Sequence, residues 1–148
     1  MSPITHTVVS AAVSVAFYQK TQSVSGTVVC FLSGIFIDID HFFDYWIAKK
    51  KVSLSYKGLK AYCAREKAGK LYLIFHSYEL LALLWYFVLT MPQLPMVWLG
   101  LAVGTSAHIM LDRMGNPIKP WGYFLAYRAK HRFSKRKFFP KELYERMR

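Results

Sequence analysis

The chain has 148 residues, a hydrophobic content of 54% and a formal net charge of +12. This length suffices for one domain with a buried core, and no internal repeat divides it, so we expect a single domain over residues 1–148. Apolar and basic residues occupy different stretches, which is unusual for a soluble domain and indicates a membrane. The aromatic residues lie inside the apolar runs, so anionic lipid headgroups account for the basic charge better than nucleic acid does. Cys30 and Cys63 show no paired spacing, so we expect no disulfide.

Four apolar runs predict an all-α bundle of about four membrane-embedded helices. The first two runs, residues 4–18 and 24–37, are joined by a polar turn and predict a helical hairpin over residues 1–47. The alternation of apolar and acidic residues around Asp38 also suits a strand. No partner strand follows at turn spacing, so a helix is favoured.

A strongly basic connection follows at residues 48–70, and we expect a short helix within it over residues 57–67. This connection either is a solvated charged face or contacts lipid headgroups. The next run, residues 71–91, has about twenty mostly apolar residues, enough for a helix to cross a hydrocarbon core of about 30 Å. Prolines at positions 92 and 95 then predict a tight turn.

The fourth run, residues 94–111, completes a second hairpin over residues 71–114. Residues 115–148 are aromatic and then basic, which predicts an amphipathic segment at the membrane interface. Placing both basic stretches on the cytoplasmic side obeys the positive-inside rule, so the chain is expected to be a multi-pass membrane protein with a cytoplasmic C-terminus. The first run gives only about 22 Å of helix, so a shallowly embedded bundle stays an alternative.

Acidic and histidine residues are set into these apolar runs, most densely at residues 34–44, GIFIDIDHFFD. An unpaired charge in such surroundings is unfavourable by several kcal/mol, so these groups should be paired, neutral or bound to a cation. Five of the eight acids lie in or beside hydrophobic runs: Asp38, Asp40, Asp44, Glu79 and Asp112. We expect Asp44 to have a structural role and His131, in the basic tail, to lie at the surface.

Three pairs have the spacing of neighbours on a helix face, namely Asp38 with His41, His76 with Glu79, and His108 with Asp112. The topology above places these pairs and His6 at the cytoplasmic end of the bundle. A lone buried histidine is more often a hydrogen-bonded core residue than a ligand, but several imidazoles and carboxylates together suit zinc or another divalent ion in an open, catalytic site. They exceed the needs of one ion, so two ions or supporting roles are expected.

Several ordered motifs resemble the YdjM family of inner-membrane-associated, metal-dependent hydrolases. They are Thr5-His6, the Gly34 to His41 block ending in Asp-Ile-Asp-His, His76-Ser77, and His108 to Asp112 followed by Gly115-Asn116-Pro117. The resemblance implies an all-helical fold related to zinc-dependent phospholipase C and single-strand nucleases, with a zinc cluster for phosphodiester hydrolysis. It implies the metal residues His6, Asp38, Asp40, His41, His76, His108 and Asp112, and it leaves Glu79 as ligand or base.

The sequence therefore predicts a membrane-embedded, zinc-dependent hydrolase that acts on a phosphoester, such as a phospholipid headgroup. Asp38 or Asp40 would accept the proton of the attacking water. One alternative is a non-catalytic membrane protein with a structural metal and a basic tail that binds lipid or a partner. A metal-dependent glycosyltransferase is disfavoured because strands and helices do not alternate, and nuclease activity stays open. Substrate, metal identity and oligomeric state do not follow from the sequence.

Overall fold

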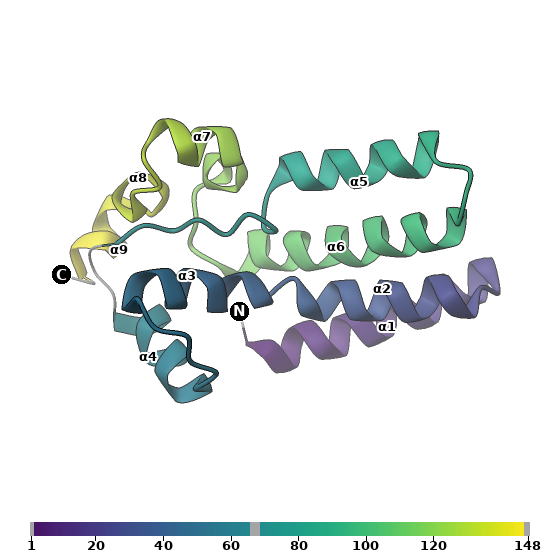
Figure 1. Ribbon diagram of the computed structural model, residues 1–148, viewed down its shortest axis with the longest axis horizontal. Helices are drawn as coiled ribbons and strands as arrows, with labels where there is room; N and C mark the ends of the chain where they lie inside the picture. The colour runs from purple at the N-terminus through teal and green to yellow at the C-terminus, as the bar shows by residue number, and fades with distance from the viewer. Residues whose placement is uncertain (1, 66–68, 147–148) are drawn as a thin grey trace. The chain divides into compact units, whose positions relative to one another are not determined.

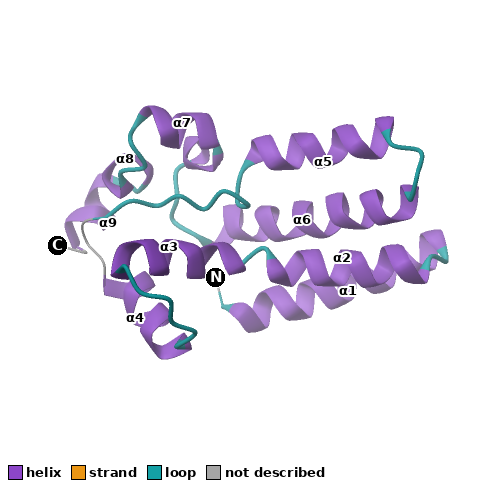
Figure 2. Cartoon of the chain, in the orientation of Figure 1, coloured by secondary structure: helices purple, strands orange, loops and turns teal. Residues whose placement is uncertain are grey.

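The computed structural model describes residues 2–65 and 69–146, and within these ranges the chain forms helices and no strand (Figures 1 and 2). The all-α prediction is confirmed. The chain divides into two compact units. The bundle unit comprises Met1–Ile37 and Tyr78–Asn116, and the loop unit comprises Asp38–Ser77 and Pro117–Arg148. The single-domain expectation stays a prediction.

The bundle unit consists of α1 (Pro3–Thr21), α2 (Val24–Phe36), α5 (Tyr78–Thr90) and α6 (Pro95–Gly115). Helix α2 packs against α1 and α6, α1 also contacts α6, and α5 packs against α6 (Figure 1). The first hairpin turns sharply because Gln22 has a left-handed backbone that ends α1 and Ser23 caps α2. The predicted hairpins of apolar helices are therefore present in this unit.

Two glycines allow the close contact between α2 and α6. A Cβ atom added at Gly100 would collide with the carbonyl oxygen of Gly26, and one added at Gly104 would collide with the carbonyl oxygen of Cys30 and with Ser33 Oγ. The backbones of these helices approach each other directly, as small residues permit in membrane bundles.

Burial in the bundle unit departs from that of a water-soluble bundle, in which helices bury their apolar faces. Many of the side chains that face neighbouring helices are small or polar: Ser10, Ser14, Gly26, Gly34, Gly100, Gly104 and Thr105. Many large apolar side chains face outward instead: Ile4, Val8, Val15, Val28, Leu32, Phe36, Leu83, Tyr86 and Leu89. Leu89, for example, is 83% exposed. This outer surface suits an apolar environment or a partner better than water.

The loop unit contains α3 (Ile39–Lys49), α4 (Tyr56–Arg65), the 3₁₀ helix η1 (Pro120–Tyr123), α7 (Leu125–Lys130), α8 (Lys135–Phe138) and α9 (Lys141–Arg146). The described part of the segment between α4 and α5, residues 69–77, is an extended loop (Figure 2). Its start pairs with the C-terminal region, because the Leu71 amide donates to Phe133 O at 2.8 Å and the Lys135 amide donates to Gly69 O at 3.2 Å. Leu71, Leu73 and Phe138 form a small core beneath it.

Three sequence predictions of helix boundaries or segments need correction. Residues 71–77 are not helical, so α5 begins only at Tyr78 and is shorter than the twenty-residue helix expected. Asp40, Asp44 and Arg128 bind backbone amides and carbonyls of residues 72–76 that would have been paired within a helix. The tail forms several short helical turns rather than one amphipathic segment, and its Arg128 and Lys135 are buried. The first apolar run continues beyond its predicted end, to Thr21.

Other expectations agree with the structure. Helix α4 confirms the predicted short helix, although residues 66–68 and the side chain of Cys63 lie outside the described residues. Cys30 is buried and free of any disulfide. The expected number of membrane-embedded helices is not among these agreements. Within the described chain, one helical stretch, Val24–Lys49, is long and apolar enough to cross a membrane by length and composition alone, so the bundle of about four membrane-embedded helices stays a prediction.

The substitution Gly104→Ala tests the close contact between α2 and α6. The added methyl group must displace the α2 backbone, so we expect the free energy of unfolding to fall by about 2 kcal/mol. Thermal unfolding of the detergent-solubilised protein measures this change. Gly115→Ala is the matched control at the exposed end of the same helix, and an equal loss in both variants would contradict the packing described.

Candidate metal centre

One cluster of predicted ligands lies in the loop unit, at the start of α3 and the end of the 69–77 loop. Asp38 precedes the first residue of α3, and the His41 amide donates to its carbonyl oxygen at 3.1 Å. Asp38 Oδ1 lies 3.5 Å from His41 Nε2 and 3.4 Å from His76 Nε2. The three ligand atoms all lie within 4.8 Å of one another, which is close enough for a single ion to bind them together.

Asp40 holds the His76 ring in the orientation that this cluster needs. Its Oδ2 lies 3.3 Å from His76 Nδ1 and accepts the backbone amides of Phe75 at 2.6 Å and His76 at 3.3 Å. A carboxylate at Nδ1 fixes the proton there and leaves Nε2 as the nitrogen that can bind a metal. The predicted role of Asp40 as a direct ligand stays a prediction.

The loop that carries His76 is held from its other side by Arg128 of α7. Arg128 is 1% exposed, and its guanidinium donates hydrogen bonds to three backbone carbonyls of the loop. They are those of Tyr72, Leu73 at 2.7 Å and His76 at 2.9 Å. A guanidinium presents several donors in a rigid plane, so it can bind several carbonyls at once.

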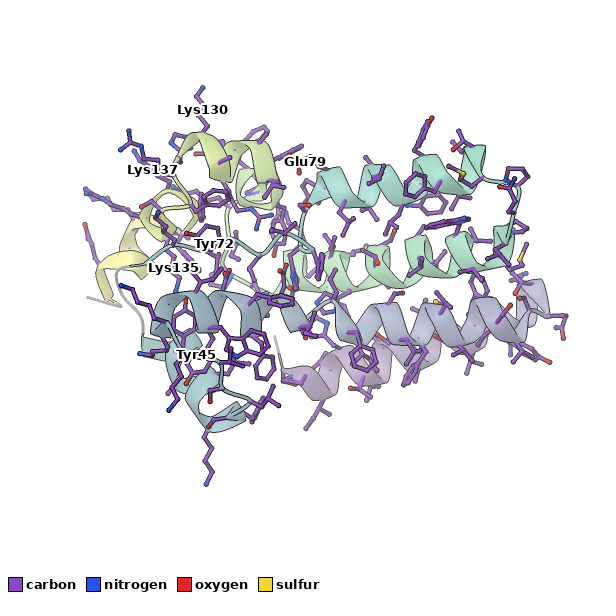
Figure 3. All side chains as sticks on the ribbon, viewed as in Figure 1. Tyr45, Tyr72, Glu79, Lys130, Lys135 and Lys137 are labelled. Carbon is purple, nitrogen blue, oxygen red and sulfur yellow. The ribbon has the colours of Figure 1, made fainter. Side chains whose placement is uncertain are left out.

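Asp44 of α3 completes this arrangement, since its Oδ2 accepts the Tyr72 amide at 2.9 Å. Buried carboxylates thus bind amides of the loop while a buried guanidinium binds its carbonyls. Figure 3 labels Tyr72 on this loop and Lys135, whose Nζ lies 4.8 Å from the centre of the Tyr62 ring. The structural role expected for Asp44 agrees with this contact.

Sequence reasoning missed Arg128. It lies within a run of basic residues, and neither charge nor spacing distinguishes it from its exposed neighbours Lys130 and Arg132. The one available signal was the apolar and aromatic composition of residues 121–127 just before it.

A second cluster lies in the bundle unit, where α1 and α6 bring together His6, His108 and Asp112. His6 Nε2 lies 3.2 Å from Asp112 Oδ1, and His108 Nε2 lies 3.7 Å from Asp112 Oδ2. The two imidazole rings stack with their centres 3.9 Å apart. The predicted pairing of His108 with Asp112 on one helix face is confirmed.

The hydrogen bond of His108 determines which of its ring nitrogens faces Asp112. His108 Nδ1 lies 2.8 Å from the carbonyl oxygen of Gly34, which only accepts, so this nitrogen carries a proton. In a neutral ring the lone pair of Nε2 would then point toward a carboxylate oxygen. That arrangement is repulsive unless a proton or a metal ion lies between them.

His6 adds an orphaned polar atom to the same cluster. Its side chain is buried, and its Nδ1 has no hydrogen-bond partner among the described residues. A buried nitrogen left without a partner is unfavourable by about 1–3 kcal/mol. Imidazole and carboxylate groups are ligand types of zinc, and a metal ion at this second cluster stays a prediction.

The remaining site predictions have mixed outcomes. His76 precedes α5, so the helix-face pairing of His76 with Glu79 is wrong. Glu79 lies at the exposed start of α5 in the bundle unit (Figure 3), and its role as ligand or base stays a prediction. His131 is partly buried, with its ring centre 4.4 Å from that of Tyr127.

The gathering of all predicted ligands in one place stays a prediction, because the two clusters belong to different units of the chain.

A scan against models of protein families found no match, and searches of curated proteins and of solved structures found none either. The resemblance to the YdjM family therefore stays an expectation from the sequence motifs.

The substitution Arg128→Lys tests how the loop is held. Lysine cannot bind the carbonyls in the same plane, so we expect the free energy of unfolding to fall by about 3 kcal/mol and metal affinity at the loop-unit cluster to fall by about tenfold. Calorimetric unfolding and zinc titration measure the two effects. The matched control is Arg132→Lys at an exposed position, which should change neither. Unchanged zinc affinity in the Arg128 variant would contradict this role.

Proposed function

We propose that this protein is a metal-dependent hydrolase that acts on a phosphoester. The observation that carries the proposal is the cluster of Asp38, His41 and His76, whose ligand atoms lie within 4.8 Å of one another. Mixed imidazole and carboxylate ligands are those of hydrolytic zinc sites. When bound, a divalent ion supplies a Lewis acid that activates water and offsets negative charge on phosphorus.

The chain's own carboxylates divide between two tasks. The Asp38 side chain is 34% exposed, so water and substrate can reach it, and we assign it the role of proton acceptor as well as ligand. Asp40 is 3% exposed and is occupied by backbone amides, so it orients His76 instead. Glu79 is a second candidate base from the bundle unit.

The two clusters differ in burial, which favours different roles. His41 and Asp38 are partly exposed, as a catalytic ion with an open position requires. His6, His108 and Asp112 are each at most 4% exposed, which favours a structural ion. A wholly non-catalytic protein with structural metal remains the second candidate, and the buried cluster is the observation in its favour.

The surface of the bundle unit supports a location in a membrane. Its outward-facing apolar side chains and its small residues at helix contacts are the pattern of bundles embedded in lipid. We propose a multi-pass protein of the cytoplasmic (inner) membrane with its C-terminus in the cytoplasm. A phospholipid headgroup is then the phosphoester within closest reach.

Metal analysis of variants tests the metal sites. We expect His41→Ala to lose the loop-unit ion and hydrolysis of bis(p-nitrophenyl) phosphate together, because both need the same ligands. We expect His108→Ala to lose one ion per chain and thermal stability. His131→Ala is the matched control and should keep both the metal content and the activity. Elemental analysis of purified protein measures the metal content.

Two results would overturn the proposal in different ways. Equal metal content in the wild type, the His41 variant and the His131 variant would reject the loop-unit site. Metal lost from the His41 variant, with no hydrolysis of any phosphodiester by the wild type, would favour the non-catalytic candidate.

Membrane topology has its own test. A reporter active only in the cytoplasm, fused after Arg148, should be active, because the positive-inside rule keeps the basic connection and tail on that side. The protein should also stay with the membrane after alkaline carbonate extraction, since its outward-facing apolar side chains contact lipid. Release into the supernatant would contradict the embedded bundle.

A further inference from the structure

The C-terminal region of the loop unit contains a pocket of about 470 Å³ that the hydrolase proposal does not use. Its lining comes from the residue before η1 and from the chain that follows as far as α9: Lys119, Tyr127, Arg136, Lys137, Phe139, Lys141 and Glu145. Pockets of this volume accommodate small organic molecules. All of these residues belong to one compact unit.

The charge of the lining is strongly positive. Four cationic side chains and one carboxylate surround the pocket. The carboxylate of Glu145 lies 3.9 Å from Lys141 Nζ, so it offsets the charge of this lysine, one of the four cationic residues. Three cations remain to attract an anion, and Arg136 can bind two phosphate oxygens through its planar guanidinium.

The aromatic part of the lining is anchored in the core of the unit. Tyr127 and Phe139 both pack against the cluster of Leu71, Leu73 and Phe138. The Lys119 amide donates to Phe138 O at 2.8 Å, which fixes one edge of the pocket to α8. The aromatic walls are thus formed before any ligand arrives, which reduces the entropy lost on binding.

We propose that this pocket binds an organic phosphate, with the phosphate on Arg136 and the lysines and the carbon portion against Tyr127 and Phe139. A pocket of about 470 Å³ has room for a carbon portion beside a phosphate group. Positive charge alone would suit any anion, whereas aromatic walls add affinity for an attached carbon group. The ligand is either a soluble organic phosphate or the headgroup of an anionic phospholipid. The inference does not rest on the hydrolase activity.

Calorimetric titration of the detergent-solubilised full chain, with any bound metal ions retained, tests the pocket through the difference between the wild type and a variant of the lining. Three probes are used: phenyl phosphate, inorganic phosphate, and a short-chain phosphatidylglycerol below its micelle concentration. We expect phenyl phosphate to bind about tenfold more tightly than inorganic phosphate because of the aromatic walls. Arg136→Met should weaken phenyl phosphate binding by about tenfold.

Lys130→Met is the control, because it removes one positive charge from an exposed position of α7 that does not line the pocket. Figure 3 labels Lys130 on α7 and Lys137, one of the lining residues. The control should change phenyl phosphate binding by less than about twofold. If phosphatidylglycerol binds to the wild type and this binding is lost with Arg136→Met, the ligand is a lipid headgroup. If phosphatidylglycerol does not bind to the wild type while phenyl phosphate does, the ligand is a soluble organic phosphate.

Three results would overturn the inference. They are no binding of phenyl phosphate to the wild type, equal weakening by the Arg136 and Lys130 substitutions, or inorganic phosphate binding as tightly as phenyl phosphate. Each can occur whether or not the metal site hydrolyses phosphoesters, so failure of the pocket is separable from failure of the proposed function.

Discussion

The loop before α5 is held in place by buried charges of both signs, and the candidate catalytic site depends on that arrangement. Arg128 binds three of the loop's carbonyl oxygens, while Asp40 and Asp44 bind its amides. Buried backbone groups must be hydrogen-bonded, and a loop without helical or sheet pairing has to obtain its partners from side chains. The same contacts hold His76 next to Asp38, so the geometry of the candidate ligands depends on how this loop is held.

The bundle unit has a different distribution of side chains: it buries polar groups, while its outward-facing surface is largely apolar. Glycines at positions 100 and 104 bring α6 against α2, and the same helix continues to His108 and Asp112. The glycines that allow close backbone packing and the buried residues His108 and Asp112 therefore follow one another along α6. In lipid such a polar cluster has no competing water, which increases the need for a compensating cation.

Helical periodicity was enough to predict the helices of the bundle and the pairing of His108 with Asp112, since both depend on local spacing. The non-helical start of the 71–91 run, residues 71–77, was not predictable in this way. Its residues are as apolar as those of α5, and the choice between helix and loop is made by Asp40, Asp44 and Arg128, which are distant in sequence. The burial of Arg128 was not predictable either, because its partners are backbone carbonyls, which every residue has and which therefore leave no pattern in the sequence. The His41 and Asp38 spacing was visible, whereas the supporting role of Asp40 required the structure.

The claim that Asp38, His41 and His76 together bind a divalent ion is tested most directly by X-ray absorption spectroscopy of the zinc-loaded protein. We expect imidazole nitrogen and carboxylate oxygen ligands at about 2.0–2.2 Å, with less imidazole scattering after His76→Ala. A first shell of water oxygens alone, or a spectrum unchanged by that substitution, would contradict it.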